Sequence, residues 1–268
     1  MNQKFWVGVA VVVAVLAILV VVGKKRQTSE VHETASAAQQ LSDQASSLES
    51  SGQKLEAKAL YQKILTDYSD FDKIETIQKQ LADLNMEIIF SNAQTPQTVV
   101  HEVKEGDSLG KIAKQYHTTQ ELIKKSNNMT GDTVRLGQKL RVWTGVFNIF
   151  VDKSQNILIL KCADEIIKVY NVSTGANNST PVGAFKITSK LVDPVWFKSG
   201  AVIPPESPEN VLGSRWMGFD LAGYGIHGTV EPDKIGQQVT AGCVRMTNKD
   251  VEEIFSVVPV GTQVTIVD

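Results

Sequence analysis

The feature that most constrains this chain is an apolar segment near its start, unbroken from Phe5 to Val22. As a helix with a rise of about 1.5 Å per residue, a segment of this length nearly matches a hydrocarbon core of roughly 30 Å. A helix that is apolar on every side fits lipid better than the surface of a soluble domain. The segment therefore predicts a transmembrane helix, with residues 1–26 forming a membrane anchor and its basic flank.

A cleaved signal peptide is the alternative interpretation, because it also contains an apolar segment. Such a peptide would have a shorter apolar stretch and a small-residue cleavage site directly behind it, whereas Gly23-Lys24-Lys25-Arg26 follows here. We therefore favour an uncleaved anchor. The positive-inside rule, applied to Lys4 and to this basic flank, places the C-terminal side in the cytoplasm. That orientation conflicts with the functions expected of the later segments.

Composition narrows the class of protein. The chain of 268 residues is 42% hydrophobic and 21% charged, so it can bury a core. A net charge of −2 argues against nucleic acid as the main partner. The two cysteines, Cys162 and Cys243, are too few for a disulfide framework or a four-cysteine zinc site.

Residues 27–90 have the spacing of amphipathic helices, broken at Gly52 and near Tyr68. They predict an α-helical hairpin spacer that resembles a fragment of a tetratricopeptide repeat. A repeat solenoid needs about three repeats for stability, so a spacer or self-association hairpin is favoured over a peptide-binding array. The polar residues 91–97, which include Pro96, predict a linker.

Residues 98–143 have the pattern strand, helix, helix, strand. Apolar and polar residues alternate from Val99 to Val103, as in a half-buried strand. Thr118 and Glu121 have the spacing of a capping box and predict the start of the second helix. After Gly137, the residues to Val142 predict a returning strand.

This segment resembles a LysM domain over essentially all of its length. The resemblance implies a βααβ fold that binds glycans containing N-acetylglucosamine, such as peptidoglycan, without identifying individual ligand residues. His101 and His117 have no neighbours at metal-ligand spacing, so we expect them at the surface or at a strand edge. The resemblance is carried by Val103, Gly106-Asp107-Ser108-Leu109, Ile112-Ala113, Tyr116, Asn127-Asn128 and Gly137-Gln138-Lys139-Leu140.

Residues 147–268 predict a mainly β domain, because short β-type runs alternate with glycine, proline and asparagine turns. One helix of note is expected, over Asp250–Phe255. The expected strands include Phe147–Val151, Ile157–Leu160, Ile166–Val172 and Val264–Val267.

Cys243 and His227 are the candidate chemical pair of this domain. Cys243 follows a glycine in Thr240-Ala241-Gly242-Cys243, and His227 is the only histidine between residues 147 and 268. A thiol with a pKa near 8.5 is mostly protonated at neutral pH, so a nucleophilic cysteine needs a base. From these residues alone a small buried cysteine is the favoured interpretation, and catalysis is the alternative.

The domain resembles the catalytic domain of L,D-transpeptidases of the YkuD type across nearly its whole length. Several separate motifs follow the order of that family. They are Ile149-Phe150-Val151-Asp152, Ser173-Thr174-Gly175, Thr180-Pro181-Val182-Gly183, Pro194-Val195-Trp196, Gly225-Ile226-His227-Gly228-Thr229, Gly242-Cys243-Val244-Arg245-Met246 and Gly261-Thr262.

The resemblance implies a role for each residue of the candidate site. Cys243 matches the nucleophile and His227 the general base and acid, with the Gly228 carbonyl orienting the imidazole. The Gly242 amide is a candidate oxyanion donor, and Arg245 either holds a substrate carboxylate or packs structurally. Ala241 departs from the family pattern, which usually has histidine or arginine before the Gly-Cys pair.

The chain is thus expected to be a multi-domain protein, with a membrane anchor, a helical spacer, a LysM module and a mainly β L,D-transpeptidase domain outside the cytoplasm. The resemblance implies cross-linking of peptidoglycan by acyl transfer from tetrapeptide stems through a thioester, and acylation of the cysteine by carbapenems. This mechanism needs neither a metal nor an organic cofactor, and a disulfide would consume the nucleophile, so we expect both Cys162 and Cys243 to be free. The LysM module would raise the local concentration of cell-wall substrate for a tethered enzyme. An L,D-carboxypeptidase and a non-catalytic cell-wall binding protein remain the alternatives.

Overall fold

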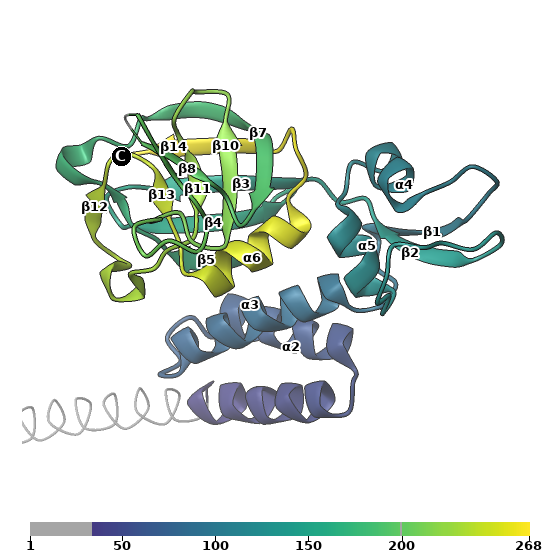
Figure 1. The fold of residues 1–268 in the computed structure, drawn as a ribbon. Coiled ribbons are helices and arrows are strands. Elements are labelled where there is room, and N and C mark those ends of the chain that lie inside the picture. The colour runs from purple at the N-terminus through teal and green to yellow at the C-terminus, as the bar shows by residue number, and fades with distance from the viewer. Residues whose placement is uncertain (1–33, 199) are drawn as a thin grey trace, which may run out of the picture. The chain divides into compact units, whose positions relative to one another are not determined.

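The computed structural model describes residues 34–198 and 200–268 and divides into two compact units, one ending at Leu84 and one running from Asn85 to Asp268 (Figure 1). The predicted membrane anchor, residues 1–26, lies outside the described residues. Among the residues that are described, no helix is both long and apolar enough to cross a bilayer.

The first unit is helical. Residues 34–50 are helical, and α2 (Lys54–Asp67) and the start of α3 (Ile74–Phe90) follow. The turns between them fall at Gly52 and after Tyr68, where the sequence predicts breaks. The Tyr61 ring is fully buried, and its hydroxyl donates a 3.0 Å hydrogen bond to Glu49 Oε2.

The LysM segment has the predicted βααβ order, with β1 (Thr98–Glu102), α4 (Leu109–Gln115), α5 (Gln120–Ser126) and β2 (Lys139–Trp143). The strands pair antiparallel and the two helices pack on them around a small core of their own. The capping-box prediction is wrong by one residue. Thr119, not Thr118, is the N-cap of α5, and its hydroxyl accepts a hydrogen bond from the Leu122 amide at 2.9 Å.

His101 is predicted at the surface or at a strand edge. It lies on β1 of the two-stranded sheet, but it is 7% exposed and is therefore not a surface side chain. Its Nδ1 lies 3.1 Å from the Tyr116 hydroxyl and its Nε2 lies 3.0 Å from Asp107 Oδ2. Asp107 Oδ2 also accepts a hydrogen bond from the Lys104 amide at 2.8 Å. The imidazole is therefore a polar cross-link between β1 and the loop that leads into α4, and its partners satisfy both ring nitrogens.

The LysM module contacts the rest of the second unit through two basic side chains. Arg141 on β2 donates to the Ile89 carbonyl at 2.9 Å and to the Ala93 carbonyl at 2.6 Å. Burial lowers the pKa of this guanidinium to about 10. Lys125 Nζ donates to Ser256 Oγ at 2.9 Å. The segment 91–97, predicted as a linker, is also hydrogen-bonded at its end, where the Thr144 hydroxyl donates to the Gln97 carbonyl at 3.1 Å.

The C-terminal domain is built on an eight-stranded sheet in the order β13-β11-β10-β7-β14-β3-β4-β5. The pairs β11–β13 and β14–β3 are parallel and the other neighbours are antiparallel. The strands are β3 (Phe147–Asp152), β4 (Ile157–Cys162), β5 (Glu165–Asn171), β7 (Gly183–Val192), β10 (Arg215–Phe219), β11 (Gly225–His227), β13 (Val244–Arg245) and β14 (Gln263–Val267).

Smaller elements surround the sheet. The helix α6 (Asn248–Val257) contacts β10 and β11 and is capped by Thr247, whose hydroxyl accepts from the Asp250 amide. The predicted helix Asp250–Phe255 lies within it. The remaining elements are β6 (Thr174–Gly175), the 3-10 turn η1 (Ala176–Asn178), β8 (Trp196–Lys198), β9 (Ala201–Ile203), the 3-10 turn η2 (Pro232–Lys234) and β12 (Gln238–Thr240).

Candidate active site

Three neighbouring strands at one edge of the sheet bring the candidate residues together. Trp216 on β10 is paired directly with His227 on β11, and His227 is in register with Arg245 on β13. Paired residues on neighbouring strands project from the same face of a sheet. Cys243 lies two residues before Arg245 and immediately before β13, so the thiol is placed at the end of this row.

Cys243, His227 and Arg245 line one cavity of about 390 Å³. The structure thus brings together residues from separate motifs. Sequence spacing alone could not predict that they meet. Trp196 and Trp216 line the same cavity. The other lining residues are mainly apolar: Leu191, Pro194, Val195, Phe197, Val211, Leu212, Gly223, Thr240 and Ala241.

The imidazole of His227 is buried and held in one orientation. Its Nδ1 lies 2.7 Å from the Gly228 carbonyl oxygen. A carbonyl oxygen only accepts, so Nδ1 carries the proton and Nε2 of the neutral ring carries the lone pair. Burial, with a smaller contribution from the charge of Arg245, lowers the pKa of His227 to about 4, although backbone hydrogen bonds to Gly228 and Leu212 act in the opposite direction. The ring is therefore a neutral base at physiological pH.

Cys243 is half-buried and Cys162, at the end of β4, is buried, and neither forms a disulfide. Cys243 Sγ lies 3.5 Å from the Gly223 carbonyl oxygen. Burial raises the pKa of the thiol, although a backbone hydrogen bond from Gly225 and the charge of Arg245 act in the opposite direction. Burial therefore disfavours a free thiolate at this site, so the thiol depends on a neighbouring base for its activation.

The turn before Cys243 is tied by Thr240. The Thr240 hydroxyl donates to the Cys243 carbonyl at 2.7 Å and accepts from the Gly242 amide at 3.1 Å. The Gly242 amide, expected to be open to an oxyanion, is therefore already bonded in this structure. Gly242 has φ of +132°, and a Cβ there would lie 2.7 Å from the Tyr224 ring. A side chain at this position is excluded by both the backbone conformation and the neighbouring ring.

Arg245 has an acidic partner that the sequence did not indicate. Its Nη1 lies 3.1 Å from Glu231 Oε2, and Arg245 is 7% exposed. Lys234 Nζ lies 2.6 Å from Glu231 Oε1. Lys234 and Arg245 together lower the pKa of the Glu231 carboxyl. The guanidinium thus keeps its charge beside the site, where it favours a thiolate and disfavours an imidazolium.

Asn248 is a second residue that the sequence analysis missed. Its Oδ1 accepts from the Ser214 amide at 3.1 Å and from the Thr229 amide at 3.0 Å. A Cβ on Gly228 would lie 2.2 Å from this oxygen. Asn248 therefore fixes the backbone that presents the Gly228 carbonyl to His227. Its position at the start of a helix is the only sequence signal, and that signal indicates capping instead.

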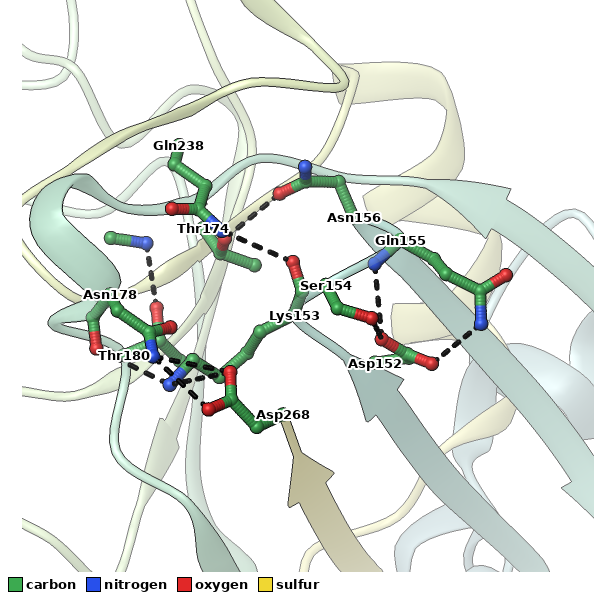
Figure 2. Close-up of polar contacts among 11 residues, drawn as sticks. Asp152, Lys153, Ser154, Gln155, Asn156, Thr174, Asn178, Thr180, Gln238 and Asp268 are labelled. Carbon is green, nitrogen blue, oxygen red and sulfur yellow. Dashed lines mark hydrogen bonds and ion pairs between the residues drawn. The ribbon is translucent and has the colours of Figure 1, made fainter.

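A buried lysine supports the other side of the nucleophile turn. Lys153 is 2% exposed, and Figure 2 shows its ammonium between Asn178 and Asp268. Its Nζ donates to the Asn178 carbonyl at 3.3 Å and lies 3.8 Å from Asp268 Oδ1. Asn178 ends η1, and η1 follows Gly175, where a Cβ would lie 3.0 Å from the Gly242 Cα. The network thus backs the turn that carries Cys243.

Replacing Lys153 by methionine is expected to lower the free energy of unfolding by about 1–3 kcal/mol, because the Asn178 carbonyl loses a partly buried donor. Acylation of Cys243 is expected to slow by less than about tenfold, since η1 acts on the turn only through packing. Thermal unfolding and adduct formation measure the two effects. Lys186→Met, at an exposed lysine on β7, is the control and should leave both unchanged.

Among residues 34–198 and 200–268, no group of three or more His, Cys, Asp or Glu side chains is placed to hold a metal ion. The chemistry available to the site is that of a thiol, an imidazole and hydrogen-bond donors. This combination can perform acyl transfer through a thioester.

Comparison with known proteins identifies both domains. The family model for the L,D-transpeptidase catalytic domain matches residues 147–266, and the model for the LysM domain matches residues 101–143. Putative L,D-transpeptidase YqjB of Bacillus subtilis is 40% identical over 126 residues, covering 45% of this chain and 70% of the relative. Putative L,D-transpeptidase YkuD of Bacillus subtilis is 30% identical over 175 residues, covering 63% of this chain and 98% of the relative. An L,D-transpeptidase structure from Mycobacterium smegmatis aligns with a TM-score of 0.39 at 19% identity, covering 49% of this chain and 64% of that one.

Proposed function

This chain belongs to the YkuD family of L,D-transpeptidases, and from that premise we propose that Cys243 and His227 cross-link peptidoglycan stems by acyl transfer. The observation that carries the proposal is the fixed tautomer of His227, whose Nδ1–H is donated to Gly228. That geometry leaves Nε2 as the base in the cavity that Cys243 also lines.

In the first half of the reaction, Cys243 Sγ attacks the carbonyl carbon of the L,D peptide bond before the terminal D-alanine of a tetrapeptide stem. Nε2 of His227 takes the thiol proton as the carbon–sulfur bond forms. The same nitrogen then gives this proton to the amine of D-alanine, which leaves as the peptide bond breaks. The product is a thioester between Cys243 and the shortened stem.

In the second half, the side-chain amine of a diamino acid on a neighbouring stem attacks the thioester carbonyl. His227 takes a proton from that amine, the carbon–sulfur bond breaks, and the proton returns to the thiolate. The amide of Cys243 is the oxyanion donor that remains open while Thr240 holds the Gly242 amide.

The LysM module contributes peptidoglycan binding in this proposal. It would hold glycan strands near the catalytic cavity. A membrane anchor at residues 1–26 would place the enzyme outside the cytoplasm, where its substrate lies. Carbapenems, whose strained amide presents a carbonyl to a thiolate, are expected to acylate Cys243.

Two other functions use the same residues. An L,D-carboxypeptidase would transfer the acyl group to water instead of to an amine. A non-catalytic cell-wall binding protein is favoured only by Ala241, which leaves the cavity without the polar side chain usual in the family. The neutral, oriented imidazole of His227 argues against the second alternative.

The test is intact-protein mass spectrometry of the full-length chain after incubation with disaccharide-tetrapeptide, together with analysis of the muropeptide products. We expect a transient acyl adduct and cross-linked dimers with the wild type, and neither with Cys243→Ala. Cys162→Ala is the matched control and should behave as the wild type, because Cys162 is buried at the end of β4.

The outcomes separate the three functions. An adduct followed only by tripeptide product would assign the carboxypeptidase reaction. The absence of both adduct and product from a folded wild-type chain would contradict the proposal and favour the binding protein.

A further inference from the structure

The side chain that flanks the catalytic imidazole across the sheet is an indole. The rings of Trp216 and His227 stack with centroids 6.0 Å apart and an interplanar angle of 22°. The two residues are directly paired across β10 and β11, so the stack is set by strand register rather than by a mobile loop.

Two glycines lie beside this stack, on the same face of the sheet. Gly218 and Gly225 are paired with each other two positions along the same two strands. A Cβ on Gly218 would lie 2.8 Å from the indole Nε1, and a Cβ on Gly225 would lie 2.9 Å from indole Cζ2. The indole therefore lies over the two glycines, and any larger residue at either position would push it away.

The imidazole is enclosed by few charged groups. Arg245 is in register with it on β13, and Cys243 precedes that strand. Glu231, after β11, pairs with Arg245. Arg215 on β10 lies instead toward Asp193 and Glu252 of α6. On the β10 side, His227 is therefore covered by an uncharged group, the indole of Trp216.

We infer that Trp216 is a positioning residue for the acyl transfer, whose indole, seated on Gly218 and Gly225, holds the imidazole of His227 toward Gly228 and keeps water from one of its faces. The inference rests on the proposed function for the part that concerns catalysis. An aromatic ring stacked on a buried imidazole restricts its rotation and contributes to its desolvation, and desolvation favours the neutral base.

The direct test measures His227 without turnover. NMR titration of the histidine side chains in the full-length chain should show His227 protonating at higher pH in Trp216→Ala than in the wild type, by about one pH unit or more. Trp216→Phe, which keeps a smaller ring, should show an intermediate shift. The matched control is Trp143→Phe, because Trp143 also stacks on an aromatic ring, Phe147, at 5.7 Å but is remote from the site. It should leave the His227 titration unchanged.

The kinetic test separates positioning from substrate contact, since Trp216 also lines the cavity. For tetrapeptide, Trp216→Ala should lower kcat by about tenfold or more, with KM within about twofold of the wild type. The acidic limb of its pH–rate profile should move upward with the His227 titration. A raised KM with an unchanged kcat and an unchanged titration would overturn the inference and make Trp216 a substrate contact.

A second variant displaces the indole without removing it. Gly218→Ala is expected to displace Trp216, because the added Cβ would meet only the side chains of Ser189 and Trp216. It should shift the His227 titration in the same direction, with circular dichroism confirming that the chain is folded. If both Trp216→Ala and Gly218→Ala fold and neither moves the titration, the inference is wrong. A wild type that shows the titration shift against these variants but no acyl adduct would instead refute only the proposed function.

Discussion

Replacing His227 by alanine is expected to slow acylation of Cys243 by about 10²–10⁴-fold, the usual contribution of a general acid–base group. The burial of both groups makes the effect large. Burial raises the pKa of the thiol, so little thiolate exists without a base. The same imidazole must also protonate the leaving amine, and alanine provides no replacement for either transfer. The rate of adduct formation with disaccharide-tetrapeptide, followed by intact-protein mass spectrometry, measures the change.

The wild type has a matching pH dependence. His227 acts as a base only when neutral, and burial lowers its pKa to about 4. Acylation should therefore be insensitive to His227 protonation above about pH 5 and should fall as pH decreases through about 4. A free histidine, with a pKa near 6.5, would already lose activity between pH 7 and 6.

The control for this experiment is His117→Ala, at an exposed histidine of the LysM module. It should acylate at the rate of the wild type. Retention of more than about a tenth of the wild-type rate by His227→Ala would show that another group removes the thiol proton. The assignment of the base would then be wrong, even if Cys243 remained the nucleophile.

Replacing Thr240 by valine is expected to be the next most severe change, with acylation slowed by about 10–100-fold. Valine has nearly the same shape but cannot donate to the Cys243 carbonyl or accept from the Gly242 amide. Each buried group left unpaired costs about 1–3 kcal/mol. The turn therefore loses the two hydrogen bonds that set the direction of Sγ and of the Cys243 amide. Sγ is then less well positioned to attack the substrate.

Thr240→Ser keeps the hydroxyl and should recover most of the rate. Thr118→Val is the matched control, because Thr118 is a buried threonine whose Oγ1 has no hydrogen-bond partner among the described residues. It should leave acylation unchanged. Equal rates for Thr240→Val and the wild type would show that the turn holds its shape without the hydroxyl.

The parts of the fold that depend on local spacing could be predicted from the sequence. The βααβ order of the LysM module is confirmed, because alternation and helical spacing are local signals. The exact cap of α5 was missed, because Thr118 and Thr119 both carry the hydroxyl that a cap requires. Burial of His101 was missed for a different reason. Its partner Tyr116 lies on another element, and local sequence does not show which side chains meet.

The residues of the candidate site also fall into those that local sequence indicates and those that it does not. Cys243, His227 and Gly228 could be proposed because they match short motifs of the family that the sequence resembles. Glu231 and Asn248 could not, because they act through contacts that only the folded chain creates. An acidic residue in a polar loop and an asparagine at a helix start have common structural explanations. Sequence alone gives no reason to prefer a role at the site.

The hydrogen bonds of the LysM module have a consequence for the product. A module on a free linker would let the enzyme search a volume around the bound strand, and cross-links would form at scattered distances from it. Here Arg141 bonds β2 to the Ile89 and Ala93 carbonyls, and Lys125 bonds α5 to Ser256 of α6. These bonds restrict the movement of the module relative to the catalytic domain. We therefore expect cross-links to form within a narrower range of distances from a bound glycan than a free linker would give.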